Sequence, residues 1–232
     1  QGPRARELLM PLVEGIDLSR EALPHMSVRD GSICGVPTRL FRVSFTGELG
    51  FEVNVPADYG FAVWEAIWTE ARRFDAVAYG TEAMHVMRAE KGYIIIGQET
   101  DGTVTPQDLG LEWAIAAAKP DFVGKRSLAR PDLVKPGRKQ LVGLFTTDPQ
   151  RVLEDGAQIV ATADPPKGTP ALGHVTSSYW SETLGRSIAL ALVAGGRGRH
   201  GERLHVPDPR GSTPVSLVDP IFHDREGKRL DA

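Results

Sequence analysis

The stretch SFTGELGFEVNV (residues 44–55) indicates most directly how this chain folds. Two glycines, Gly47 and Gly50, bracket a tight turn, and the residues after it alternate between apolar and polar side chains. Strict alternation is typical of a β-strand with one buried face. Glu52 therefore stands on the face away from the apolar side chains, just past the turn. Its carboxylate is either an ordinary solvated strand residue or a group placed to hold a ligand.

A strand is predicted upstream of this turn, over residues 38–46, because Phe41 and Phe45 fall on one face of it. Together with the strand at 51–55, it is expected to form a hairpin with a loop of about four residues. A further strand is predicted at 27–34.

Helical spacing of apolar residues predicts two longer helices. One covers 59–73, starts with Asp58 as its cap and buries one side. The other covers 82–91, with Thr81 as its cap and Gly92 as its stop. Short helices are predicted at 1–12, 19–23, 106–113 and 124–130, and a buried strand at 93–96.

The composition changes at residues 131–138, where two prolines and a glycine indicate a linker. Beyond it, short apolar-rich segments separated by turn residues predict six strands. These strands are expected at 140–146, 157–162, 171–178, 186–194, 202–206 and 214–219. The pattern is that of an α+β chain with a first domain at 1–130 and an antiparallel barrel or sandwich at 139–232.

The totals exclude several classes of protein. The chain has 232 residues, a formal net charge of −3 and a pI of about 6.1, which argues against a general nucleic-acid or anionic-membrane surface. No apolar run is long enough to span a bilayer. The lone Cys34 cannot form an internal disulfide, so a cytoplasmic location is expected. Because the chain begins at Gln1, without methionine or signal peptide, we expect it to be a piece of a longer polypeptide.

Two motifs have ordinary explanations. GRGRHG (residues 196–201) matches the dinucleotide fingerprint, but an alternating strand follows it where a helix is needed, so a glycine-rich turn is favoured. The basic residues Arg197, Arg199 and His200 fit a solvated loop. The six histidines have no metal-binding spacing, so no metal site is predicted.

Two groups could bind a ligand. Glu82, His85 and Arg88 recur every three residues on the helix at 82–91, and such a stripe either lines a cleft or faces solvent. Glu52 offers two coplanar acceptors beside glycines that allow a ligand to approach the backbone. A pterin, which is a 2-amino-4-oxo heterocycle, presents two adjacent N–H donors that match a carboxylate.

Four stretches of the chain, in order, resemble blocks of the aminomethyltransferase (glycine-cleavage T-protein) family. They are VSFTGELGFEVNVPADYGFAVWEAI (43–67), MRAEKGYIIIGQETDGTVTPQDLGLEWAI (87–115), KPDFVGKRSL (119–128) and GHVTSSYWSETLGRSIALALV (173–193). Within that family, the sequence is most similar to the C-terminal part of the α subunits of heterotetrameric sarcosine oxidases. The resemblance implies the latter part of a T-protein-like folate-binding domain, followed by a small six-stranded antiparallel β-barrel.

The resemblance also implies roles for individual residues. Glu52 matches the family glutamate that binds the pterin edge, and no protein nucleophile is expected. The folate-binding residues it implies are Thr46, Gly47, Glu48, Glu52, His85 and Arg88. The chain departs from the family at Met84 and His85, where many members have an arginine–aspartate pair. It departs again at Ile96, where an aromatic residue is usual. A family acid from the first half of the folate domain would lie upstream of this chain.

The implied function is capture, by tetrahydrofolate, of the one-carbon unit released from sarcosine, giving 5,10-methylenetetrahydrofolate. FAD, FMN and NAD are expected elsewhere in the complex, together with the other sarcosine oxidase subunits and a small amine substrate. The fragment alone is expected to be inactive. Two other hypotheses stay open: a non-catalytic folate-binding or assembly module, and a barrel that binds single-stranded nucleic acid through Arg197, Arg199 and Arg203.

Overall fold

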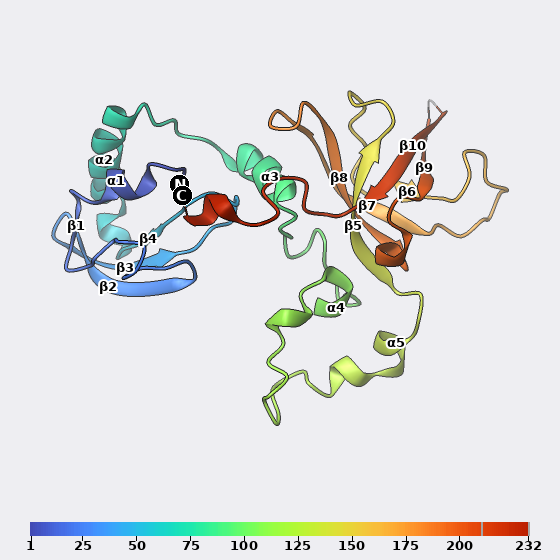
Figure 1. The fold of residues 1–232 in the computed structure, drawn as a ribbon, viewed down its shortest axis with the longest axis horizontal. Helices are drawn as coiled ribbons and strands as arrows, with labels where there is room; N and C mark the ends of the chain where they lie inside the picture. Colours follow the sequence, from blue (N-terminus) through green and yellow to red (C-terminus); the bar gives the residue numbers. More distant parts are fainter. Residues whose placement is uncertain (210, 232) are drawn as a thin grey trace. The chain divides into compact units, whose positions relative to one another are not determined.

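A computed structural model describes residues 1–209 and 211–231 (Figure 1). The chain divides into two compact units: Gln1–His85 together with the segment that starts at Asp224, and Val86–His223. The predicted domain boundaries at 130 and 139 stay predictions, because compactness alone defines these units. None of the helices in the described part of the chain is long and apolar enough to cross a membrane.

The first unit contains a four-stranded antiparallel sheet in the order β1-β2-β3-β4. Its strands are β1 (Val13–Glu14), β2 (Ser27–Ile33), β3 (Val36–Arg42) and β4 (Glu52–Asn54). The predicted hairpin of β3 and β4 is confirmed, but its connection is wrong. The last pair joins Phe41 to Glu52, so the loop runs over 43–51 and is much longer than four residues.

Two helices lie against this sheet. They are α1 (Ala5–Leu9) and α2 (Gly60–Ala71), the latter flanked by the 3₁₀ turns η1 (Ala57–Tyr59) and η2 (Arg72–Phe74). The prediction for α2 is confirmed, but Asp58 does not cap it, because it lies inside η1 and Tyr59 holds the cap position without a side-chain bond. The predicted helix at 19–23 is a single turn, closed by the bond from Leu23 N to Ser19 O (2.9 Å).

Among the residues that the structure describes, the core of the first unit lies on one face of the sheet. Leu9 and Val63 from the helices pack with Ile33 and Leu40 from the strands. Residues directly opposite one another in an antiparallel sheet share a face, so the register places a second set on the uncovered face. That set comprises Val28, Asp30, Ser32, Pro37, Arg39, Phe41, Glu52 and Asn54. All eight are exposed or half-buried.

Helix α3 (Thr81–Glu90) covers nearly the predicted range and leads into the second unit, but Thr81 is its first residue and not its cap. Gly92, at φ +73°, ends it as expected. The predicted strand at 93–96 is wrong, because the amides of Gln98 and Glu99 both bond Ile95 O and turn the backbone. Short elements follow: α4 (Pro106–Leu109), η3 (Glu112–Ala114), η4 (Ser127–Ala129) and α5 (Pro131–Val134). The last of these replaces part of the expected linker.

The six predicted strands of the second half are all present in one antiparallel sheet. They are β5 (Lys139–Thr146), β6 (Gln158–Ile159), β7 (Gly173–Ser181), β8 (Arg186–Ala194), β9 (Arg203–Asp208) and β10 (Gly211–Val218), in the order β6-β7-β8-β5-β10-β9. Val160, next to β6, exchanges two 2.9 Å backbone bonds with His205 of β9. The two ends of the sheet therefore meet, and the apolar side chains inside form one core cluster.

Candidate ligand-binding site

The turn between β3 and β4 is held in one conformation by its own polar groups. Gly47 has a φ of +83° and its amide donates to Ser44 Oγ at 3.0 Å. The hydroxyl of buried Thr46 donates to the side-chain oxygen of Gln1. Glu48 forms an ion pair with Arg229 at 2.8 Å. These contacts fix the backbone that leads into Glu52.

Close backbone packing explains why a second glycine is needed in this turn. A Cβ atom on Gly50 would lie 2.8 Å from Val43 O, which is too short for any side chain. The fully buried Arg42 donates to Gly50 O at 3.3 Å and to Leu230 O, so the C-terminal segment also supports the turn. The turn is thus a rigid support and not a mobile loop tip.

Glu52 is the first residue of β4, and its side chain is exposed on the uncovered sheet face. Its neighbour on that face is Phe41, directly opposite on β3. None of the described residues forms an ion pair or a hydrogen bond with the Glu52 carboxylate. The carboxylate is therefore available to a ligand, although this chain alone does not bury it.

A surface hollow of about 450 Å³ opens over β2 and β3, and one of its lining residues, Phe41, lies directly opposite Glu52 on β4. Its lining residues are Val28, Arg29, Asp30, Arg39 and Phe41. The sides carry an ion pair from Arg39 Nε to Asp30 Oδ1 at 2.8 Å, and the hydrogen bond from Arg39 holds the pKa of Asp30 below its usual value. The hollow therefore combines an aromatic wall with charged groups, next to a free carboxylate.

Arg88, at the end of α3, lies in a different environment. Its side chain is 0% exposed and forms a 2.8 Å ion pair with the equally buried Glu99. It also donates to Tyr93 O at 3.0 Å and to Ser177 Oγ of β7 at 2.7 Å. Both terminal nitrogens are used within the chain, and its buried Nε has no partner among the described residues.

A β-bulge explains how Glu99 is held. The pairing of β7 with β8 slips between Val175 and Ser177, which leaves Thr176 as an extra residue. Neighbouring residues of a regular strand point to opposite faces, but here the hydroxyls of Thr176 and Ser177 both donate to Glu99 Oε1. The amide of Ile95 donates to Glu99 Oε2 at 2.7 Å. Glu99 therefore fixes the 95–99 turn to the sheet.

Glu90 makes a second connection of the same kind. Its carboxylate accepts from Ser181 Oγ at 2.6 Å and from Thr183 Oγ1 at 3.1 Å. The last turn of α3 is thus tied to β7 through Arg88 and Glu90. On the preceding turn of the helix, His85 is half-buried.

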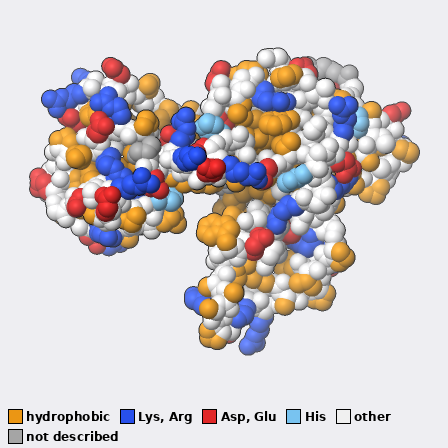
Figure 2. All heavy atoms as spheres, in the orientation of Figure 1, with side chains coloured by type: hydrophobic (Ala, Val, Ile, Leu, Met, Phe, Trp, Pro, Cys, Tyr) orange, Lys and Arg blue, Asp and Glu red, His pale blue; other side chains and the backbone are white. Residues whose placement is uncertain are grey.

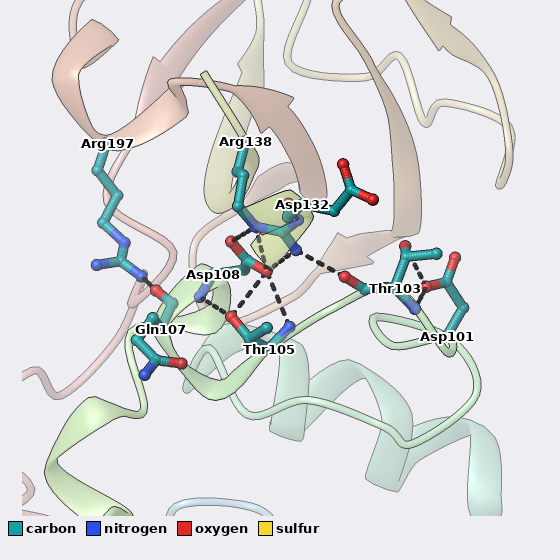
Figure 3. Close-up of polar contacts among 8 residues, drawn as sticks. All are labelled: Asp101, Thr103, Thr105, Gln107, Asp108, Asp132, Arg138 and Arg197. Atoms are coloured by element: carbon teal, nitrogen blue, oxygen red, sulfur yellow. Dashed lines mark hydrogen bonds and ion pairs between the residues drawn. The ribbon is translucent and has the colours of Figure 1, made fainter. Parts of the chain in front are cut away.

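A third polar cluster was not predicted from the sequence (Figure 3). Asp108 of α4 accepts from Thr105 N (2.8 Å) and from Arg138 Nε (2.9 Å), and Arg138 also donates to the carbonyls of Asp132 and Thr103 (2.8 and 2.6 Å). Burial by itself raises the pKa of Asp108. The hydrogen bonds that Asp108 accepts from Arg138 and Thr105 outweigh this effect, so its pKa lies below the usual value. The cluster fixes the 101–112 segment to the start of β5. Only its Thr-x-x-Asp capping box could have been read from the sequence.

The basic loop after β8 is neutralised within the chain. Arg197 pairs with Glu112 at 3.3 Å and donates to Gln107 O, as Figure 3 shows in part. Arg199 forms two 2.7 Å bonds to Glu202. Residues 196–199 form a 3₁₀ turn and β9 follows, which confirms a turn in place of a dinucleotide motif. On the face drawn in Figure 2, basic and acidic side chains are interspersed.

The architecture is that of an aminomethyltransferase. The structure superposes on the glycine cleavage system aminomethyltransferase T from Bartonella henselae with a TM-score of 0.80, at 23% identity, over 97% of this chain and 58% of that one. The family description "GCVT N-terminal domain" matches residues 1–119, and "Glycine cleavage T-protein C-terminal barrel domain" matches 139–224. The chain therefore belongs to the glycine cleavage T-protein family, which confirms the resemblance and the fold class.

Two kinds of relative share the sequence. The sarcosine oxidase subunits alpha of Corynebacterium sp. (strain P-1) and Rhizobium meliloti (strain 1021) are 45% and 41% identical, each over 99% of this chain. The aminomethyltransferase of Thermotoga petrophila is 34% identical over 94% of it. The chain spans 24% and 23% of the two oxidase subunits and 56% of the aminomethyltransferase.

The structure brings only some of the predicted folate-binding residues together. Thr46, Gly47 and Glu48 form the turn that supports Glu52. Arg88 belongs to the second unit, where the chain itself occupies its terminal donors. The folate contacts assigned to all six residues, including His85, stay predictions.

Proposed function

We propose that this chain is the folate-binding portion of a sarcosine oxidase α subunit. In that role it captures the one-carbon unit from oxidative demethylation of sarcosine as 5,10-methylenetetrahydrofolate. The observation that carries the proposal is the 45% identity to a sarcosine oxidase subunit alpha over 99% of the chain. The aminomethyltransferase relatives support a folate substrate independently.

The geometry around Glu52 fits a pterin. None of the described residues engages its carboxylate, it lies opposite Phe41, and Phe41 lines the hollow of about 450 Å³. Two coplanar acceptors next to an aromatic wall suit a flat ring with two adjacent N–H donors. The rigid turn at 43–51 would hold the carboxylate in place before the ligand arrives, which limits the entropy lost on binding.

Tetrahydrofolate, when bound, supplies the nitrogen nucleophile for the one-carbon unit. The contribution of this chain is positioning: Glu52 orients the ring, and the turn fixes Glu52. No residue of this chain is assigned a covalent step. The proposed setting is a cytoplasmic hetero-oligomer, in which other parts carry FAD, FMN, NAD and the amine site.

Substitution of Glu52 tests the proposal. Glu52→Gln in the complete polypeptide places an amide donor against a ring donor, so tetrahydrofolate binding should weaken by about 2–4 kcal/mol. Glu65→Gln, on an exposed position of α2, is the matched control and should leave affinity unchanged. Calorimetric titration measures both. Equal affinities for Glu52→Gln and the parent would remove Glu52 from the site.

The non-catalytic module is the second candidate, favoured by the departures at Met84, His85 and Ile96. Ile96 is 80% exposed, so nothing in the described chain uses it in packing. A complete polypeptide that binds tetrahydrofolate but yields only free formaldehyde from sarcosine would support this candidate. Nucleic-acid binding has little support, because Arg197 and Arg199 are already paired.

A further inference from the structure

We propose that Arg39, which lines the hollow together with Phe41, the neighbour of Glu52, binds the anionic glutamyl tail of the folate. This inference rests on the proposed function, because it takes the pterin end to lie at Glu52. Arg39, Phe41 and Asp30 are not among the folate-binding residues predicted from the sequence. The ligand chemistry is a carboxylate or a chain of carboxylates joined to a ring system.

The strand register places the required groups together on one face, with Phe41 at the corner between Glu52 and Arg39. Glu52 lies opposite Phe41, and Arg39 stands two residues further along β3. Opposite side chains in such a pair are about 5 Å apart, and the diagonal from Glu52 to Arg39 is about 7–8 Å at the Cβ atoms. Both side chains are therefore next to Phe41, Glu52 across the strand pair and Arg39 along β3, where its guanidinium bonds Asp30. The order is carboxylate, aromatic ring, guanidinium.

This order matches the polarity of a folate. The pterin end carries N–H donors, the middle is an aromatic ring, and the tail carries carboxylates. Phe41 and Val28, which is 42% exposed, give the hollow its apolar lining. A ligand lying the other way would place its carboxylates against Glu52, which like-charge repulsion disfavours.

The guanidinium of Arg39 has donors to spare. Its Nε and one terminal nitrogen bond Asp30 at 2.8 and 3.3 Å, while its other terminal nitrogen bonds none of the described residues. Arg29 also lines the hollow, but its guanidinium donates to the carbonyls of Val28 and Ala22 at 2.9 and 3.0 Å. Arg88 cannot take the same role while it is fully buried and engaged with Glu99.

Comparing ligands with and without the tail tests the proposal in the complete polypeptide. Arg39→Gln should weaken binding of tetrahydrofolate by about 3- to 10-fold and leave 6-methyltetrahydropterin, which has no tail, within about 2-fold. A polyglutamylated tetrahydrofolate should lose at least as much as tetrahydrofolate. Arg72→Gln, a second exposed arginine of the first unit, is the control and should change neither ligand.

Asp30→Asn supplies a test of opposite sign. It removes the carboxylate that competes for Arg39, so tetrahydrofolate should bind about 2- to 5-fold more tightly, with less effect on the tailless pterin. A variant that had lost its structure would bind tetrahydrofolate more weakly, so tighter binding cannot result from unfolding. Since Arg39 and Asp30 form an exposed pair that contributes little to stability, both variants are expected to fold.

The outcomes separate this inference from the proposed function. If Glu52→Gln weakens both ligands while Arg39→Gln and Asp30→Asn change neither, the tail does not lie at Arg39 and the proposed function stands. If Arg39→Gln weakens both ligands equally, Arg39 supports the site without reading the tail, and the inference is wrong. If the parent binds no tetrahydrofolate at all, the proposed function and this inference fail together.

Discussion

Replacing Glu99 by Gln should strongly destabilise the second unit. The substitution keeps the size of the side chain and removes its charge. Arg88 then remains 0% exposed, with its ion-pair partner gone. Loss of one partner from a buried pair costs about 3–5 kcal/mol, because the other charge is left without compensation. The hydroxyls of Thr176 and Ser177, which now donate to a carboxylate, would face a mixed amide group.

The magnitude can be judged against the stability of the whole fold. A domain is stable by about 5–15 kcal/mol, so the expected loss is a large fraction of the total. Urea unfolding followed by circular dichroism measures the change, and hydrogen exchange of the β7 and β8 amides locates it. Glu182→Gln, in the exposed turn after β7, is the matched control and should change stability by less than about 0.5 kcal/mol.

A double substitution separates the charge effect from a general intolerance of change. Arg88→Met with Glu99→Leu removes both charges and leaves apolar side chains of similar length. Its cost should fall well below the sum of Arg88→Met and Glu99→Leu measured singly. Additive costs, or a Glu99→Gln variant within 1 kcal/mol of the parent, would refute the idea that this pair must be kept intact.

Two further predictions concern the second unit. Because the pKa of Asp108 is lowered in the fold, its ionised carboxylate stabilises the fold fully above the unfolded pKa of about 3.9, and this stabilisation disappears as pH falls through the folded pKa. Asp108→Asn should therefore cost about 1–3 kcal/mol of unfolding free energy at neutral pH. Below about pH 4, the melting temperature of the variant should fall less steeply than that of the parent. An equally steep acid loss in the variant would contradict this. Gly143→Ala should cost about 1–3 kcal/mol in urea unfolding, because its Cβ would lie 2.5 Å from Asp219 O, whereas Gly102→Ala, with open space around it, should be nearly neutral.

Strands with clear periodicity or long apolar runs were the most predictable elements. The range 186–194 was predicted and is the range of β8, because Ile188 to Val193 are all buried and fill a continuous apolar run. The run YIII at 93–96 has the same local signal, yet it forms no strand. Periodicity alone does not identify a short apolar run as a strand, and this run is not buried: Ile96 is 80% exposed. Here Glu99 captures the Ile95 amide, a contact that the local pattern does not contain.

The buried polar groups could not be predicted for a related reason. Arg88 bonds Ser177, and Arg138 bonds Asp108, across 89 and 30 residues of sequence. In the local sequence, Arg88, Arg138 and Asp108 each look like an ordinary surface charge. These charges are buried because partners from distant segments bond most of their polar atoms, so the signal lies in the tertiary structure. The position of Glu52 on a strand just after a turn could be predicted, because the turn glycines and the alternating strand residues are adjacent in sequence.

The stripe of Glu82, His85 and Arg88 shows how the local sequence pattern and the tertiary packing can differ. Their common spacing predicts one face, but Glu82 is exposed and Arg88 is fully buried, because only the last turn of α3 packs against β7. A loss of activity on changing Arg88 would therefore report on the folding of the second unit. Substitutions at Glu52 or Arg39 act on an exposed face and leave that packing untouched. A ligand contact is thus demonstrated only where affinity changes and unfolding free energy does not.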